Sequence, residues 1–201
     1  MPFISNGTTI LDNGAFSVGL GSKILLSTAT ASSSASLSFN STYINSDYLI
    51  YKFEFINLNA STADPTFLFN MSIDNGSNYN VTKTSTAFRA IHNEAGTVTQ
   101  LIYRTNDDLA QSTAYQVISA SFGSASKDSL SGSMYLFNPS SSVFAKHFIS
   151  DVHITSSDLY SQRYFIAGYG NITTAVDAID FKAGLGNINA GQIKLYGIKG
   201  S

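Results

Sequence analysis

The sequence contains no cysteine, and this absence excludes several classes of protein at once. Disulfide-stapled scaffolds, thiol catalysis and the common zinc knuckles all depend on cysteine side chains, and none of the 201 residues is a cysteine. The chain must therefore be held together by its core alone. The sequence does not indicate whether the protein resides in an oxidising or a reducing compartment, because cysteine usage is the signal for that distinction.

Charged residues are also scarce. They make up 12% of the chain, with a formal net charge of −2, whereas soluble domains usually carry roughly 25%. The sequence isoelectric point is about 5.8. Phosphate binding needs clustered lysine and arginine, so this composition predicts that nucleic acid is not a partner.

Long hydrophobic runs are missing as well. No stretch reaches the roughly 18 apolar residues that a membrane helix requires. Residues 1–20 contain no lysine or arginine and no apolar run suited to a signal-peptide core. We expect a soluble chain without membrane insertion and without an amino-terminal secretion signal.

The chain is instead rich in short polar and aromatic side chains. It contains 31 Ser, 17 Thr and 16 Asn, while 43% of its residues are hydrophobic, including 14 Phe and 11 Tyr. This hydrophobic content is too high for a disordered chain, and the length suits one large domain. The surface must be covered by hydroxyls and amides in place of ions.

Alternation of apolar and polar residues is the main structural signal after Lys23, and it is typical of half-buried strands. In Asp47–Asn57, residues Tyr51, Phe53 and Phe55 fall on one face, and Thr66–Ile73 repeats the pattern. The other predicted strands are Ile24–Ala29, Ala35–Phe39, Val98–Thr105, Tyr115–Phe122, Leu130–Phe137, Val143–Ile154, Gln162–Gly170, Ala175–Lys182 and Gln192–Ile198. The only candidate for a helical turn is Ser85–Asn93, but its apolar residues are too few to form a convincing stripe.

About eleven short strands separated by turn signals predict an all-β fold. The expected architecture is a single antiparallel β-sandwich, jelly-roll or lectin-like, over residues 24–201. Residues 1–23 differ in texture, because Asn-Gly and Gly-rich turns interrupt short apolar patches. We interpret them as an extended arm and a docking segment.

No set of residues predicts catalysis or a cofactor. Glycoside cleavage usually needs two facing carboxylates, but Glu54 and Glu94 are the only glutamates and the aspartates fall mostly in turns. His147 and His153 share one face of a strand at about 20 Å, too far apart to share a metal. The glycine clusters lack the helix or lysine of a phosphate loop. We expect no enzyme activity, no cofactor and no metal site.

Tyrosines near the carboxyl end are the remaining candidates for a binding role. Tyr160, Tyr164 and Tyr169 lie close together in the sequence, and tyrosines on a sandwich can stack on sugar rings. Core packing or a subunit interface explains such residues more often. The three residues are therefore candidate glycan or interface contacts.

Four segments, taken in order, resemble a family of uncharacterised virion proteins from tailed, largely marine bacteriophages. Residues Tyr48–Asn57 look like that family's YxxYKFEFIN strand, and Ser72–Tyr79 like its SxDGGSxY turn. Leu130–Pro139 resemble its LSGxLxLFNP strand, and Gly186–Lys199 its closing strand. Asn75 replaces the first glycine of the turn, and Gln192 stands where threonine is common. The resemblance covers about residues 24–199.

This resemblance implies a non-enzymatic structural protein of the virion, assembled in the host cytoplasm. The expected role is a capsid decoration, cement or head-fibre-type subunit that self-associates as a homo-oligomer, for example a trimer. Residues 1–23 would contact the major capsid protein or another virion protein. The alternative is a tail fibre or receptor-binding module that recognises host surface polysaccharide. The family pattern supplies no catalytic residue.

Overall fold

The computed structural model describes the chain except residues 1–2, 6–7, 13–14, 17–22, 157–158 and 200–201. The described residues form strands and loops and contain no helix, so none of them forms a helix that could span a membrane. The strands are β1 (Phe3–Ser5), β2 (Thr8–Asp12), β3 (Ala15–Phe16), β4 (Lys23–Thr30), β5 (Leu37–Phe39), β6 (Ile50–Ala60), β7 (Phe67–Ser72), β8 (Lys83–Asn93), β9 (Thr99–Tyr103), β10 (Gln116–Ser119), β11 (Leu130–Phe137), β12 (Lys146–Thr155), β13 (Tyr160–Gly170), β14 (Ala178–Ala183) and β15 (Ile188–Ile198).

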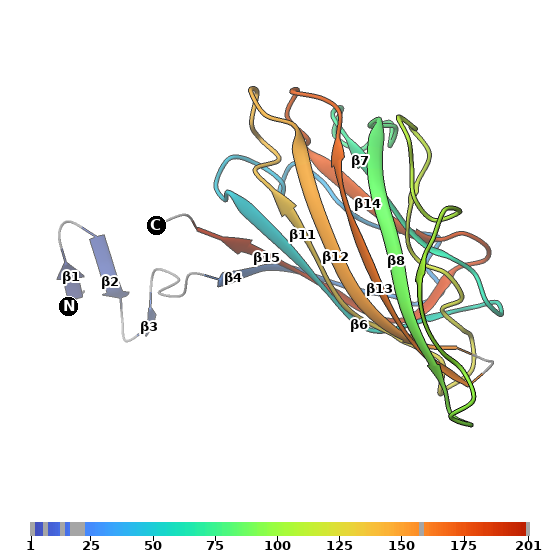
Figure 1. Cartoon of the computed structure of the whole chain (residues 1–201). Coiled ribbons are helices and arrows are strands. Elements are labelled where there is room, and N and C mark those ends of the chain that lie inside the picture. Colours follow the sequence, from blue (N-terminus) through green and yellow to red (C-terminus); the bar gives the residue numbers. More distant parts are fainter. Residues whose placement is uncertain (1–2, 6–7, 13–14, 17–22, 157–158, 200–201) are drawn as a thin grey trace.

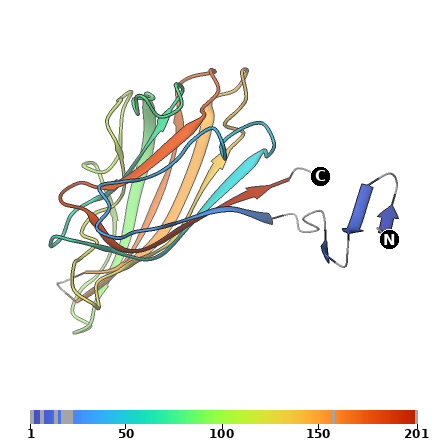
Figure 2. The same cartoon turned by 180° about the vertical axis from the view of Figure 1, so that it is seen from behind.

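Two antiparallel sheets form the sandwich (Figures 1 and 2). The large sheet has eight strands in the order β4-β15-β6-β11-β12-β13-β8-β9, and the small sheet has four in the order β10-β7-β14-β5. The chain crosses repeatedly between the sheets, for example from β6 to β7 and from β7 to β8. This arrangement confirms the expected all-β antiparallel sandwich.

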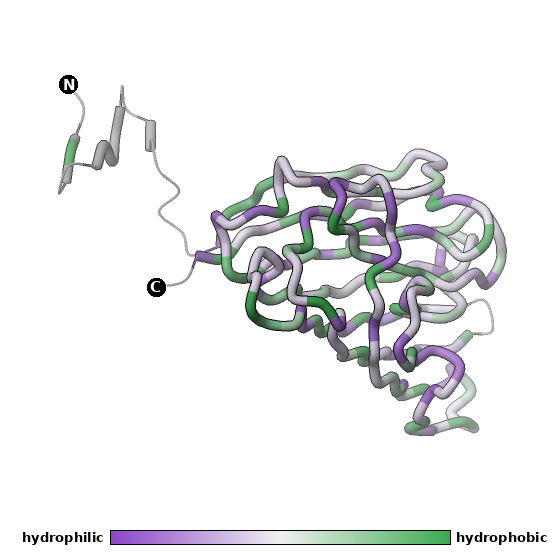
Figure 3. The backbone as a smooth tube through the Cα atoms, turned by 90° about the horizontal axis from the view of Figure 1, so that it is seen from above, coloured by the Kyte–Doolittle hydropathy of each residue, from purple (hydrophilic) through white to green (hydrophobic). Residues whose placement is uncertain are grey.

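All eleven predicted strands are present, with ends that differ by a few residues. The strand Leu130–Phe137 has the predicted bounds, and β6 shows the predicted burial of Tyr51, Phe53 and Phe55. Alternation identifies these strands because one face of each enters a common core. Figure 3 shows hydrophobic and hydrophilic residues interspersed along the whole sandwich, as such alternation requires.

The segment Ser85–Asn93, the one candidate for a helical turn, instead belongs to strand β8. Its buried positions in the first half are Lys83, Ser85 and Ala87, while Phe88 is exposed. In this half of β8 the inward face is therefore polar or small, and an aromatic residue lies on the outward face. A pattern of hydrophobicity could not reveal a strand whose inward residues are polar or small.

Aromatic rings fill the space between the two sheets. Phe181 of β14 lies at the centre of this cluster, with its ring centroid 5.1 Å from that of Phe53 and 5.4 Å from that of Phe55. Phe67 and Phe69 of β7 contact the same ring from its own sheet. Edge-to-face and tilted packing of this kind supplies a large part of the buried apolar area.

A bulge in β6 changes which residues face the core. Asn57 has a left-handed φ of 49°, after which Leu58 and Ala60 are buried in place of odd-numbered residues. A Cβ on Gly191 of the neighbouring strand β15 would lie 2.4 Å from the carbonyl oxygen of Asn57. Only glycine therefore lets β15 follow the bulge closely.

The arm contains a small sheet of its own in the order β1-β2-β3. Both pairings are antiparallel, with Ile4 opposite Thr9 and Leu11 opposite Phe16. The two predicted Asn-Gly turns lie outside the described residues. The docking role of the arm stays a prediction.

Candidate functional site

The structure separates the three candidate tyrosines. Tyr164 points into the core and is 0% exposed, and its hydroxyl accepts a hydrogen bond of 3.0 Å from Nη1 of Arg89. Tyr169 lies on the opposite face of the same strand, β13. Tyr160 begins that strand, about 30 Å from Tyr169 along an extended chain. Residues of a strand lie on the same face only when an even number of positions separates them. Tyr164 and Tyr169 are five positions apart, so the three tyrosines do not form one contact surface.

Tyr169 belongs to a face of the large sheet that no other sheet covers. We define the outer face as the side of the large sheet turned away from the small sheet. One row across it joins Asp151, Phe165, Phe88 and Tyr103 as cross-strand partners. The rings of Phe88 and Phe165 stack, with centroids 4.9 Å apart. Aromatic side chains thus lie side by side in solvent, where a strand usually presents polar residues.

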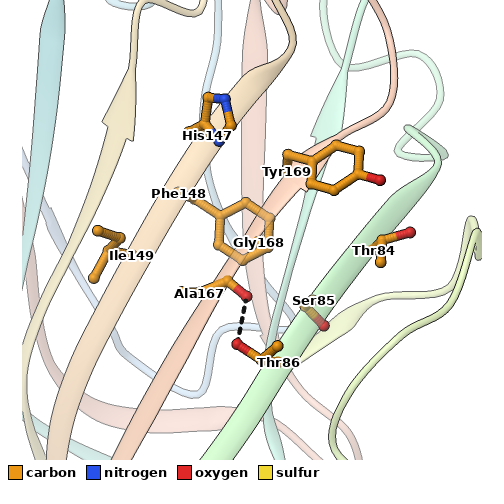
Figure 4. A pocket seen from close by; sticks show the side chains of 9 residues that line it. All are labelled: Thr84, Ser85, Thr86, His147, Phe148, Ile149, Ala167, Gly168 and Tyr169. Atoms are coloured by element: carbon orange, nitrogen blue, oxygen red, sulfur yellow. Dashed lines mark hydrogen bonds between the residues drawn. The ribbon is translucent and has the colours of Figure 1, made fainter.

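A shallow hollow of about 480 Å³ interrupts the outer face where β12, β13 and β8 meet (Figure 4). Its lining residues are Thr84, Ser85, Thr86, His147, Phe148, Ile149, Ala167, Gly168 and Tyr169.

Gly168 permits the close approach of strands beneath this hollow. A Cβ at Gly168 would lie 2.5 Å from the carbonyl oxygen of Thr84 and 2.7 Å from Cζ of Phe148. On the rim, the rings of His147 and Tyr169 are 6.2 Å apart. The hollow therefore combines an apolar floor with an imidazole, a phenol and threonine hydroxyls.

Five charged side chains on the outer face form ion pairs, namely Lys23, Lys52, Glu54, Asp151 and Arg163. Arg163 donates to both carboxylate oxygens of Asp151, at 2.9 Å and 2.6 Å. Glu54 accepts hydrogen bonds from Lys23 at 2.5 Å and Lys52 at 2.9 Å. These bonds, the one from Lys23 first, lower the pKa of Glu54 to about 2. Glu54 is thus held ionised and is unsuited to act as a general acid near neutral pH.

The lysines divide the outer face into two halves. Lys23, Lys52 and Lys194 lie on β4, β6 and β15, so this half carries more positive than negative charge around Glu54. The half formed by β13, β8 and β9 presents Phe165, Phe88, Leu101 and Tyr103, and its Arg163 is paired. One end of the outer face is basic, and the other is apolar and close to neutral.

Local contacts place the adjacent residues Asp107 and Asp108, and two histidines lie on the outward side of β12. Adjacent Asp107 and Asp108 turn to different partners, Nε of Arg104 at 2.7 Å and the hydroxyl of Tyr103 at 2.7 Å. His147 and His153 occupy exposed positions on the same face of β12, as predicted. Among the described residues no group of three or more His, Asp or Glu side chains could hold a metal ion.

Comparisons with protein-family models, with curated proteins and with solved structures found no match.

Sequence reasoning missed a buried lysine, Lys83. It is 0% exposed, and its Nζ donates to Oδ1 of Asn70 at 2.5 Å and to the carbonyl oxygen of Val81 at 2.7 Å. Burial lowers the pKa of Lys83 to about 7. A lysine of this kind can be a nucleophile when a substrate reaches it, but Lys83 is fully buried. Its bond to Asn70 links β8 to β7. Hydrophobic alternation could not reveal this buried lysine, because the inward residues in the first half of β8 are polar or small.

A second buried lysine lies in the same row of the large sheet. Lys146 and Lys83 are the cross-strand neighbours of Gly170 on either side. Nζ of Lys146 donates to three carbonyl oxygens, those of Ser141, Phe144 and Thr173. Burial lowers the pKa of Lys146 as well. The two lysines hold the loops at one end of the sandwich.

Proposed function

We propose that this protein is a non-enzymatic structural subunit of a bacteriophage virion. In this proposal it is a capsid decoration, cement or head-fibre-type subunit that self-associates on the particle surface, and residues 1–23 attach it to the major capsid protein or another virion protein. The virion assignment is supported by the four ordered segments that resemble phage virion proteins, from Tyr48 to Lys199.

The single observation that carries the assembly role is the outer face of the large sheet. Leu25, Phe88, Leu101, Tyr103 and Ile149 all expose at least two fifths of their surface there. Exposed apolar residues that gather on one face mark interaction surfaces, whereas singly scattered ones need no explanation. Depletion of charge and enrichment in aromatic residues are also typical of interface cores.

Support for a non-enzymatic role comes from what the acidic side chains do. Glu54, Asp107 and Asp151 each pair with a lysine or arginine, and Asp180 accepts hydrogen bonds from Ser38 and Tyr115. Such engaged carboxylates stabilise the fold and the surface. They do not resemble a pair of carboxyl groups that face a shared substrate.

The proposal is tested by locating the protein on purified phage particles. Mass spectrometry should detect it in the particles, and antibodies against the sandwich should label one structure on them by electron microscopy. A chain lacking residues 1–23 should keep its strand signal in circular dichroism and should no longer join particles. Particles that lack the full chain would overturn the virion role, and normal incorporation of the shortened chain would overturn the docking role of the arm.

A sugar-binding role is the second candidate, and the hollow beside Tyr169 favours it. An apolar floor with hydroxyl and imidazole groups at its rim suits one face of a sugar ring and its hydroxyls. Binding on a glycan array that is saturable, lost in Tyr169→Ala and kept in Tyr103→Ala would promote this candidate. Tyr164→Ala is unsuitable as a test, because Tyr164 is a core residue.

A further inference from the structure

Strand β9 forms an open edge of the large sheet. Among the strands that the structure describes, it is the last in the sheet order and pairs with β8 alone. Its five residues, Thr99–Tyr103, include no charge and no proline, and its register with β8 shows no bulge. Lysine, proline and bulges are the features with which proteins usually protect exposed edges. This edge carries none of them.

Hydrogen bonds at both ends of β9 show which backbone groups face outward. The N–H of Asn93 donates to the carbonyl oxygen of Val98 at 3.2 Å, and the N–H of Arg104 donates to that of Ala87 at 2.8 Å. Val98 and Arg104 therefore face β8. Backbone groups alternate between the two sides of an antiparallel strand. It follows that Thr99, Leu101 and Tyr103 direct their N–H and C=O groups to the open side.

The side chains of these residues are exposed on the outer face. Leu101 is 73% exposed and Tyr103 is 52% exposed, and Tyr103 adjoins Phe88 in the aromatic row. The open edge thus offers both unpaired main-chain groups and apolar surface. One more strand paired with this edge would form hydrogen bonds with the unpaired main-chain groups and would cover part of the apolar surface.

We propose that β9 pairs with β9 of a second copy of this chain, antiparallel, across a two-fold axis at Leu101. Leu101 then lies opposite Leu101 of the second copy, and Thr99 lies opposite Tyr103 of the second copy. Because the three outward-facing residues are symmetric about Leu101, this register forms about six main-chain hydrogen bonds. Two large sheets become one continuous sheet, and the contact is closed because each copy uses the same edge.

Charge selects a second copy at β9 over the other open edge, β4. Two β9 strands bring together uncharged residues, and Arg104, which follows β9 in the chain, is paired with Asp107 at 2.7 Å. Pairing β4 with itself would bring together the basic halves of two outer faces, which contain Lys23, Lys52 and Lys194. Like charges placed opposite one another destabilise strand pairing.

A contact made by one short strand is small, so we expect a weak dimer in solution that gains strength when many copies stand on one surface. The inference deepens the proposed assembly role and rests on it for its biological meaning. The dimer itself is measured on the purified full chain without any particle.

The first experiment compares Leu101→Lys with Leu185→Lys by sedimentation equilibrium, up to about 1 mM protein, the range of weak association. Leu185 is a matched control, because it is 67% exposed but lies in a loop. We expect a monomer–dimer equilibrium for the unchanged chain and for Leu185→Lys. Two ammonium groups on the axis should weaken the dimer at least tenfold in Leu101→Lys.

The second experiment tests the register with single cysteines, which the cysteine-free chain allows. Paired residues of this type have Cα atoms about 5.5 Å apart, within the roughly 4.4–6.8 Å that a disulfide spans. Leu101→Cys should therefore form a disulfide-linked dimer under mild oxidation. Gln100→Cys should not, because in this register Gln100 lies opposite Ile102 of the second copy and not opposite Gln100 of the second copy.

Three results would overturn the inference. These are a monomer throughout the concentration range, an unchanged dimer in Leu101→Lys, or equal cross-linking of the two cysteine variants. An unchanged dimer that is lost in Leu25→Lys would assign the contact to β4. The proposed function is judged separately, because Leu101→Lys protein that reaches particles as a monomer would keep the virion role and remove only this contact.

Discussion

The two sheets of the sandwich differ in how their faces are used. In the small sheet no residue of β7 is exposed, and even its outward Asn70 is 0% exposed. Nδ2 of Asn70 donates to the carbonyl oxygens of loop residues Tyr79 and Thr113. In the large sheet one face is open and carries exposed Phe88 and Leu101. Polar residues are thus buried in the small sheet, and apolar residues are exposed on the large one. The difference indicates that the small sheet anchors loops and that the large sheet provides the contact surface.

The largest expected effect on stability concerns the aromatic core between the two sheets. Phe181→Ala should lower the free energy of unfolding by about 3–5 kcal/mol, because its ring contacts those of Phe53, Phe55 and Phe67. Phe88→Ala on the outer face should cost about 1 kcal/mol, the value of a lost aromatic pair. Urea denaturation measures both. Equal losses would mean that the outer face packs as a second core.

The second prediction concerns the buried lysine between the sheets. The folded pKa of Lys83 is lowered to about 7 from 10.5, so the unfolded chain binds more protons between these values. Stability should therefore rise with pH across this window, by up to about 1.4 kcal/mol per pH unit. Lys83→Met should remove this contribution and leave that of Lys146. Exposed Lys127→Met should keep the full slope, and an unchanged slope in Lys83→Met would show that Lys83 is solvated.

A smaller effect is expected for the ion pairs at the basic end of the outer face. Glu54 has its pKa lowered from 4.5 to about 2, so its contribution is present above pH 4.5 and is lost as the pH falls towards 2. After solvent screening we expect about 1 kcal/mol. Acid titration of unfolding should show this loss in the unchanged chain and not in Glu54→Gln. Exposed Glu94→Gln serves as the control.

The smallest effect is expected for the exposed pair of Arg163 and Asp151. Both side chains are largely solvated, so Arg163→Ala should leave the urea midpoint unchanged. Arg104→Ala is the matched comparison, because it strips the partner from nearly buried Asp107 and should cost about 2 kcal/mol. A large loss in Arg163→Ala would mean that this part of the outer face is more enclosed than its exposure indicates.

Particular residues show how far sequence patterns reach. Alternation located β6 and β11 because Tyr51, Phe53 and Met134 face the common core. It failed at β8, where the buried residues Lys83 and Ser85 are polar. Clustering in sequence also grouped Tyr164 with Tyr169, although five positions along a strand put them on opposite faces.

The sequence by itself determined the all-β class and the positions of eleven strands, because side chains of strands that border one core alternate between apolar and polar. Its composition also determined a surface with few charged residues. Tertiary structure alone decided which face of each strand is covered. Loop residues Tyr79 and Thr113 accept hydrogen bonds from buried Asn70, whereas no sheet among the described residues covers the outer face at Phe88 and Leu101. The local sequence pattern indicates the two-residue period of a strand. Whether a face of that strand is buried depends on which other segments of the chain fold over it.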